Sequence, residues 1–196
     1  MTADDLVPLV KTTLLSPPDA ARIIMGWNLK RDVLWTGLAL MAAVNTLIIQ
    51  ALLNGSGPSA AIPSYFHAPL TLFVLMAGVM VIYVHTLFWA GLMIKGQGRL
   101  DDLLALVVWL LALRTAAQVA VLLVSLLVPA LGMLALMLIS VWGLWILLNF
   151  IATALNLPSV AHGLVVLVIG LIGLVLGLGI LLTLIGIGPQ GSTDYV

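Results

Sequence analysis

The chain has 196 residues, of which 63% are hydrophobic and 7% are charged, and its net charge is zero. Soluble domains carry about 25% charged residues, so this composition excludes a soluble fold and indicates an integral membrane protein embedded in the lipid bilayer. The neutral charge balance gives no indication of nucleic-acid binding, and the absence of cysteine excludes disulfides, thiolate metal sites and thiol catalysis.

Residues 1–32 are predicted to form an amphipathic cytoplasmic segment that lies on the membrane and is not a separate domain. In the stretch SPPDAARIIMGWNLK, Ser16 stands at the N-cap position and Pro17 at the first helical position. Ile24 and Trp27 share one face, which suits a helix in the headgroup layer. Its role is either a simple orientation anchor or a docking surface. The residues expected to anchor it at the interface are Trp27, Arg22, Lys30 and Arg31.

Five long apolar runs follow, and a spanning helix needs about 20 such residues. The region from Leu103 to Leu155 would reach about 80 Å as a single helix, so Pro129 and Gly132 are predicted to break it into two spans. The predicted fold class is therefore all-α: a polytopic membrane protein with a bundle of five transmembrane helices after the N-terminal interfacial amphipathic helix, with four or six spans as alternatives. The expected spans are 33–53, 69–94, 103–127, 131–155 and 163–187, which form a transmembrane domain over 33–187, followed by a short C-terminal tail at 188–196.

The positive charges of the loops predict the orientation, because cytoplasmic loops carry an excess of Lys and Arg. Such residues precede the first span and occupy loop 95–102, whereas loop 54–68 holds none. They are Lys11, Arg22, Lys30, Arg31, Lys95 and Arg99. Five spans then place the N-terminus in the cytoplasm and the C-terminus on the opposite side.

Polar side chains within the spans are candidate functional residues, since polar groups in hydrocarbon are costly and usually face the bundle interior. Counted from the cytoplasmic end of each helix, Asn45 lies about 18 Å deep, His85 about 14 Å and Arg114 about 17 Å, which predicts one layer near mid-bilayer. Asn149 lies shallower, at about 9 Å. Gln118 is one turn from Arg114 on the same face, and Asn149 shares a face with two tryptophans. Both faces are expected to point at protein.

Arg114 has no carboxylate partner inside any expected span, and Asp101 and Asp102 lie about three turns away. A mid-membrane arginine costs roughly 2.5–3.5 kcal/mol on insertion scales. Three ways of satisfying this charge remain open. They are neutral acceptors inside the bundle, a lipid phosphate that the side chain reaches by snorkelling, and a carboxylate on another subunit.

The last span is rich in glycine. Gly163, Gly170 and Gly177 recur every seven residues, and Gly173 forms a GxxxG pattern with Gly177. Small residues let membrane helices approach closely. These four glycines therefore predict helix packing, either within the chain or between two copies of it.

Side chains suited to a catalytic, metal or cofactor site are scattered in the sequence. The histidines are His67, His85 and His162, and none has a second ligand at helical spacing. Haem requires axial ligands on facing spans, and only His85 is well placed for that. Paired acids and Ser–His arrangements are missing from the expected spans. We expect no enzymatic activity, no metal and no cofactor.

Three stretches resemble the Yip domain family, the Ypt/Rab-interacting proteins and their bacterial relatives. LLSPPDAARIIMGWN resembles the segment before that family's first span, GQGRLDDLLALVVWLLALRTAAQV its Gly-rich cytoplasmic loop and third span, and LWILLNFIATALNL the fourth span of the bacterial branch. The likeness covers about residues 14–185. Bacterial relatives often carry a His-Gly pair soon after Asn-Phe, whereas here ATALNLPS stands before His162 and Gly163.

The resemblance implies a non-enzymatic membrane protein. Eukaryotic members act in vesicle traffic and membrane shaping and bind small GTPases, and they usually have a longer soluble N-terminal region. The short N-terminal segment here fits the bacterial branch, which implies a bacterial cytoplasmic (inner) membrane and a periplasmic C-terminus. Two functions follow as hypotheses. The first is a protein that organises membrane or scaffolds a membrane protein partner or its own oligomer. The second is an accessory subunit or small permease-like protein that binds an anion or lipid headgroup through Arg114, Gln118, His85, Asn45 and Asn149.

Overall fold

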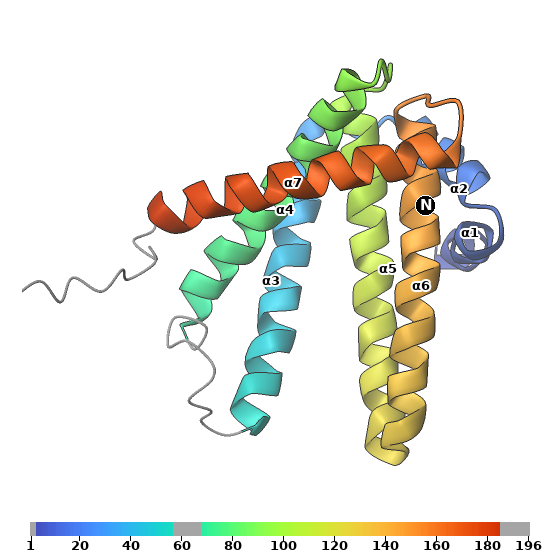
Figure 1. Cartoon of the computed structure of the whole chain (residues 1–196). Coiled ribbons are helices and arrows are strands. Elements are labelled where there is room, and N and C mark those ends of the chain that lie inside the picture. The colour runs from blue at the N-terminus through green and yellow to red at the C-terminus, as the bar shows by residue number, and fades with distance from the viewer. Residues whose placement is uncertain (1–2, 57–67, 185–196) are drawn as a thin grey trace, which may run out of the picture.

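The computed structural model describes residues 3–56 and 68–184, and all regular structure in this part of the chain is helical (Figure 1). Its helices are α1 (Ala3–Leu15), α2 (Pro17–Gly26), α3 (Arg31–Ser56), α4 (Pro69–Met93), α5 (Leu100–Leu127), α6 (Pro129–Ala154) and α7 (Val160–Leu184). The five helices from α3 to α7 are long and apolar enough to cross a membrane, which confirms the predicted all-α, five-span fold. The tail 188–196 and the last residues of the expected span 163–187 lie outside the described residues.

The expected break at Pro129 is present. Helix α5 ends at Leu127, Val128 is extended (φ −141°, ψ 98°), and α6 begins at Pro129. Proline disfavours the helical conformation in the preceding residue and needs no N–H partner at the first helical position, so it ends one span and begins the next. A Cβ at Gly132 would lie 2.6 Å from Cβ of Ser125. Glycine therefore allows the two antiparallel helices to approach closely beside the turn.

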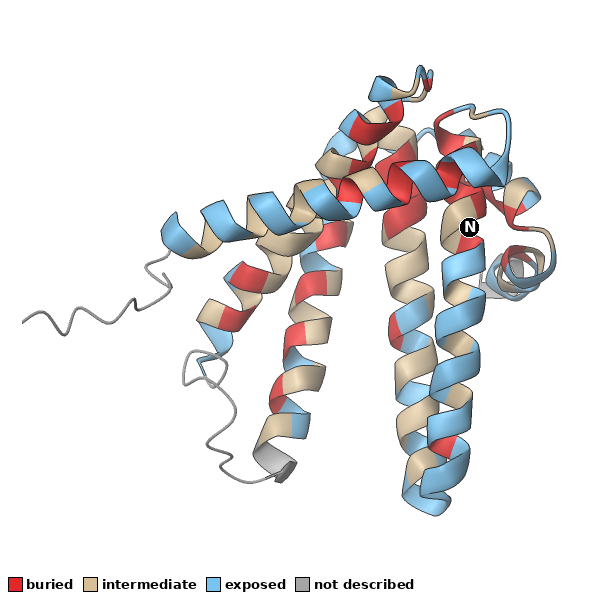
Figure 2. Ribbon diagram, viewed as in Figure 1, coloured by how far each residue is buried: buried red, intermediate tan, exposed pale blue. Residues whose placement is uncertain are grey.

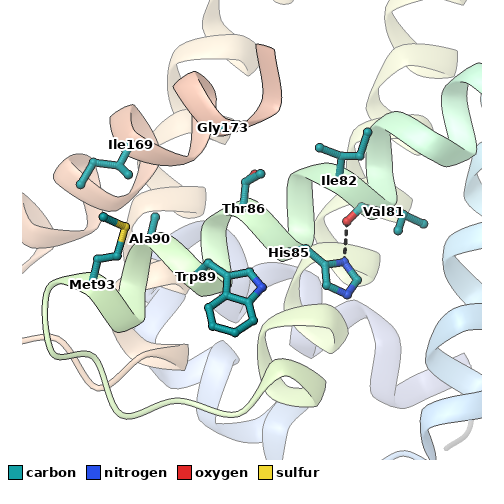
Figure 3. Close-up of a pocket in the computed structure, with 9 residues that line it drawn as sticks. All are labelled: Val81, Ile82, His85, Thr86, Trp89, Ala90, Met93, Ile169 and Gly173. Carbon is teal, nitrogen blue, oxygen red and sulfur yellow. Dashed lines mark hydrogen bonds between the residues drawn. The ribbon is translucent and has the colours of Figure 1, made fainter. Parts of the chain in front are cut away.

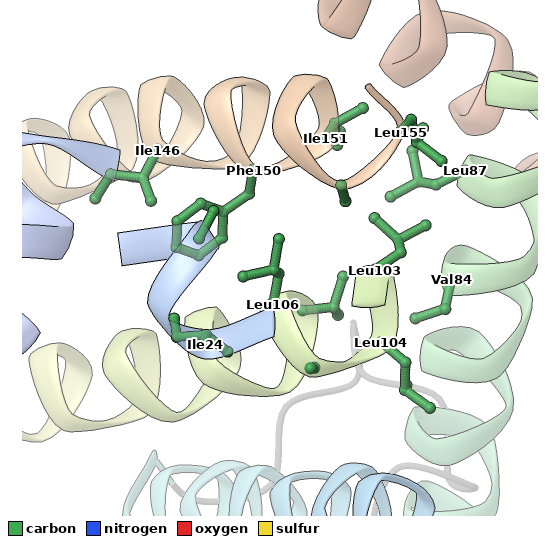
Figure 4. Close-up of a cluster of buried hydrophobic side chains, with 14 of the residues drawn as sticks. Ile24, Val84, Leu87, Leu103, Leu104, Leu106, Ile146, Phe150, Ile151 and Leu155 are labelled. Atoms are coloured by element: carbon green, nitrogen blue, oxygen red, sulfur yellow. The ribbon is translucent and has the colours of Figure 1, made fainter. Parts of the chain in front are cut away.

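The hydrophobic core lies at one end of the helices, where α2 packs against α5 and α6 (Figure 2). Ile24 on α2, Leu106 on α5 and Phe150 on α6 belong to this core, and each is at most 1% exposed (Figure 4). By contrast, most residues between Val119 and Val141 are exposed. The far half of the α5–α6 pair therefore buries little surface within the chain, and lipid or another protein must cover it in a membrane.

Helix α7 does not run parallel to the α5–α6 pair. It crosses the other helices obliquely in Figure 1, packing against α6 near its start and along α4 over much of its length. This arrangement differs from a simple upright bundle, and it places the glycine-rich face of α7 against α4.

Two loops are joined at the core end of the molecule. The backbone N–H of Gln97, after α4, donates to the carbonyl of Leu155 at the end of α6 (2.9 Å), and the side-chain amide of Asn156 donates to the carbonyl of Gln97 (3.0 Å). Asn156 has φ 51°, a conformation that asparagine tolerates better than most residues. A Cβ at Gly98 would collide with the carbonyl oxygen of Ala154. The GQG stretch therefore needs its second glycine so that the two loops can touch.

Candidate functional site

A polar contact joins α3 to α5 in the middle of the spans. The side-chain amide of Asn45 donates to the carbonyl of Met41 (2.9 Å) and to Oγ1 of Thr115 (3.1 Å). Thr115 is buried at 9% exposure. The sequence analysis did not single out Thr115. A hydroxyl inside an apolar span, next to Arg114, could have marked it as a candidate for a contact between helices. The inward position on α5 is thus held by threonine, paired with one of the expected site residues.

Arg114 is exposed, unlike the inward orientation expected from the sequence. Successive residues on a helix are turned by roughly 100°, so Thr115 facing α3 turns Arg114 away from that contact. Tyr83 on α4 lies within electrostatic range of the guanidinium. Within the described residues, Arg114 has no ion pair and no hydrogen bond. Arg114 therefore makes no hydrogen bond to a neutral acceptor inside the bundle, which was one of the three possibilities that the sequence left open.

Gln118 lies one turn beyond Arg114 and carries the second unsatisfied group of this region. Its side-chain oxygen is buried and has no hydrogen-bond partner within the described residues. A buried acceptor without a donor costs about 1–3 kcal/mol. Arg114 and Gln118 thus present an unpaired donor and an unpaired acceptor about one helical turn apart, and we call these two residues the α5 polar pair.

His85 does not join this region. Its Nδ1 lies 2.8 Å from the carbonyl oxygen of Val81, and its ring stacks on Trp35 of α3, with 5.7 Å between ring centroids and 20° between planes. Tyr83 is two residues away, about 200° around the helix, so His85 points away from Arg114. Asn45, His85 and Arg114, which depth places at one level, therefore do not meet in one site, because depth along a helix carries no information about direction around it.

Asn149 is buried at 6% exposure, and its amide donates to the carbonyl of Trp145 (2.8 Å). Trp142 and Trp145 on the same expected face are 49% and 41% exposed. The asparagine of this face therefore points into the bundle, whereas the two tryptophans stay partly exposed, with the Trp142 indole N–H bonded to the carbonyl of Leu14 on α1. One of the two amide hydrogens of Asn149 is therefore bonded within its own helix.

The glycines of α7 lie close to neighbouring helices of the same chain. An added Cβ at Gly163 would lie 2.7 Å from the carbonyl oxygen of Leu148 on α6. On the α4 side, the nearest atoms would be Leu87 Cδ2 at 2.8 Å from Gly170, Thr86 Cγ2 at 3.0 Å from Gly173 and Ile82 Cγ2 at 2.7 Å from Gly177. Their missing side chains leave the space in which α4 and α6 approach α7.

Two of the residues expected to anchor the N-terminal segment contact the helices of the core end. Trp27 packs edge-to-face on Trp109 of α5, with 6.1 Å between ring centroids. Nε of Arg31 lies 3.0 Å from Oδ1 of Asp101. The Arg31 side chain is 63% exposed, and such exposed pairs contribute little stability. These contacts fix the position of the segment relative to α5.

Ser16 occupies the N-cap position of α2, as expected, but its side chain does not cap the helix. The Ser16 hydroxyl donates to the carboxylate of Asp19 (2.5 Å) and makes no capping bond to the backbone. Asp19 also pairs with the exposed Arg22 (2.7 Å), so this carboxylate, rather than an N–H group of the helix, draws the hydroxyl. Pro17 does occupy the first helical position, as expected. Lys30 is exposed and has no ion pair in the described part of the chain.

Helix α1 is held against the sides of the spanning helices. The indole N–H of Trp109 donates to Oγ1 of Thr13 (3.1 Å), and that of Trp142 donates to the carbonyl of Leu14 (3.1 Å). Trp142 lies about 18 Å along α6 from Ala154. The N-terminal segment therefore contacts the sides of α5 and α6. The indole N–H of Trp142 is hydrogen-bonded there, although much of its ring is exposed.

Residues 3–56 and 68–184 hold no group of three or more side chains that could bind a metal ion. His67 lies outside the described residues, and His162 Nδ1 contacts the Ser159 hydroxyl at 2.8 Å. Besides Thr115, the sequence did not single out Tyr83 beside Arg114 or Trp35 against His85. Aromatic residues inside apolar spans carry no signal that separates lipid contact from protein contact.

Comparison with known families gives a match over nearly the whole of the described region. Residues 11–182 match the family model described as the Yip1 domain. No curated protein and no solved structure matches the chain.

Proposed function

Because the chain belongs to the Yip1 domain family, as the resemblance predicted, we propose that it is a non-enzymatic membrane protein that scaffolds a partner membrane protein within the bilayer. The observation that carries this proposal is the α5 polar pair. Arg114 presents a charge with no described hydrogen bond or ion pair, and the Gln118 oxygen is buried without a donor. Polar groups at such depths are expensive, and contact with a partner relieves the cost.

The pair defines the chemistry of the partner. A guanidinium forms its strongest hydrogen bonds with a carboxylate, and an amide oxygen requires a donor such as a hydroxyl or an amide N–H. A transmembrane helix that carries an acid and a hydroxyl or amide about one turn apart would satisfy both groups. No expected span of this chain carries an acid, so such a helix belongs to another membrane protein.

The alternative function, binding of an anion or lipid headgroup, is supported by the exposed guanidinium alone. A phosphate accepts hydrogen bonds from Arg114 but offers no donor to the Gln118 oxygen. Arg114 also lies near the middle of α5, about 21 Å along the helix from Leu100 and about 20 Å from Leu127. A headgroup at the surface is therefore farther from the site than a partner helix inside the bilayer.

Photocrosslinking tests the partner directly. Val121 shares the face of Arg114 and Gln118 at helical spacing, so a photoreactive amino acid at this position is expected to capture a protein in native membranes. The matched control is Leu176 on α7, which is 67% exposed, where we expect lipid adducts. Adducts of lipid alone at both positions would contradict the scaffold proposal.

We propose a bacterial cytoplasmic membrane, as the resemblance to the bacterial branch implies. The loop charges favour an N-terminus in the cytoplasm. The chain has no cysteine, so single cysteines report topology without background. Ser56→Cys is expected to react with an impermeant thiol reagent in intact cells, and Gln97→Cys only after the cells are permeabilised. Labelling in the opposite order would reverse the orientation.

A further inference from the structure

A groove of about 490 Å³ lies between α4 and α7 (Figure 3). This volume is within the range of about 300–1,000 Å³ that is typical of ligand sites. Its lining includes Ile82, His85, Trp89 and Met93 from α4 and Ile169 and Gly173 from α7. Both helices are membrane-spanning candidates, so the molecules that reach this groove are those dissolved in the bilayer.

Gly173 lines the groove and packs closely against α4. A Cβ there would already lie 3.0 Å from Cγ2 of Thr86, so any larger side chain would extend into the space between the helices. On the same face of α7, Gly170 and Gly177 meet α4 more closely, at Leu87 and Ile82. Helices α4 and α7 are therefore close at all three glycines, and the groove lies beside this line of contact.

The groove contains one free hydrogen-bond acceptor. A carbonyl oxygen only accepts, so the 2.8 Å contact with Val81 requires that Nδ1 of His85 carries the proton. In the neutral ring, Nε2 then holds a lone pair, and this atom has no partner within the described residues. The stacked Trp35 ring restricts rotation of the imidazole. The Thr86 hydroxyl is already bonded to the Tyr83 carbonyl (3.0 Å).

A donor lies one turn from this acceptor. Trp89 is 63% exposed at the groove, and its indole N–H has no partner within residues 3–56 and 68–184. No charged side chain lines the groove. A phosphate or ammonium group would therefore find no counter-charge, whereas a hydroxyl can donate to His85 and accept from Trp89.

We propose that this groove binds an uncharged lipid with a free hydroxyl, whose acyl chain lies along the apolar walls and whose hydroxyl donates to Nε2 of His85. This site is independent of the α5 polar pair, because His85 and Tyr83 lie on different sides of α4. An uncharged lipid also suits the depth of His85, about 12 Å along α4 from Met93, which is below the level at which phosphate groups lie.

The test uses the full chain in proteoliposomes with two photoreactive probes that have the same acyl chains, a diacylglycerol and a phosphatidylcholine. Diacylglycerol is expected to label α4 and α7 at the groove, with several-fold higher yield than phosphatidylcholine. His85→Leu should reduce that yield about fivefold, since one hydrogen bond is lost. Gly173→Leu should abolish it by filling the groove, whereas Gly179→Leu, where nothing lies within 4 Å of an added Cβ, should leave it unchanged.

Equal labelling by the two probes would identify ordinary boundary lipid and overturn the proposal. If His85→Leu leaves the diacylglycerol labelling unchanged and Gly173→Leu abolishes it, the proposal that His85 recognises the lipid hydroxyl is overturned. If Gly173→Leu fails to fold, the comparison of the parent chain with His85→Leu decides the outcome, because that substitution removes the acceptor and keeps an apolar side chain.

Discussion

Replacing Gly163 with leucine is expected to produce the largest loss of stability of any single change on α7. An added Cβ would lie 2.7 Å from the Leu148 carbonyl oxygen and 3.6 Å from Cβ of Ala152. The first of these atoms belongs to the backbone of α6, so relief requires that α6 and α7 separate. Overpacked sites cost typically about 1–3 kcal/mol, and we expect about 3 kcal/mol here, which corresponds to a fall in Tm of about 6–12 °C for a domain of this size.

Thermal unfolding of the purified chain in detergent measures this effect, and Gly179→Leu is the matched control. Gly179 is on the same helix, with nothing within 4 Å of an added Cβ, so its replacement should leave Tm nearly unchanged. Gly177→Leu should fall between the two, because it meets the movable side chain of Ile82. An unchanged Tm for Gly163→Leu would show that α6 and α7 do not pack in this way.

Replacing Arg114 with leucine is expected to abolish recovery of the partner while leaving the isolated chain at least as stable as before. The side chain has no described hydrogen bond or ion pair, so its removal breaks none within the chain and removes the cost of a charge at this depth. In a complex, the same substitution would leave the partner's carboxylate buried and unpaired. Loss of one member of a buried ion pair costs about 3–5 kcal/mol.

The measurement is paired: Tm of the purified variant, and mass spectrometry of the proteins recovered with it from solubilised membranes. Arg114→Lys is expected to restore recovery only in part, because an ammonium group replaces the two-pronged guanidinium. Ser140→Leu is the control, since Ser140 is exposed on α6 and its hydroxyl is satisfied by the Leu136 carbonyl. Full recovery of partners with Arg114→Leu would exclude a carboxylate partner for this residue.

The sequence by itself determined the class of protein, the number of spans and the break at Pro129. These features follow from a single constraint: backbone groups in hydrocarbon must be hydrogen-bonded within a helix, so apolar length and helix-breaking residues mark the elements. It also identified the α7 glycines, because only glycine gives other helices such close access to the backbone. The family could be recognised because its motifs lie in these same local features.

Only the tertiary structure decided which faces of the helices meet. Depth placed Asn45, His85 and Arg114 in one layer, yet Asn45 bonds to Thr115 and His85 stacks on Trp35. The sequence did not predict the oblique course of α7 either. In a soluble protein, the apolar stripe of a helix marks its inner face. In a membrane, lipid and protein are both apolar surroundings for the helix, so the pattern of hydrophobic residues no longer distinguishes inside from outside, and the direction of each polar side chain is set by the packing of the folded chain.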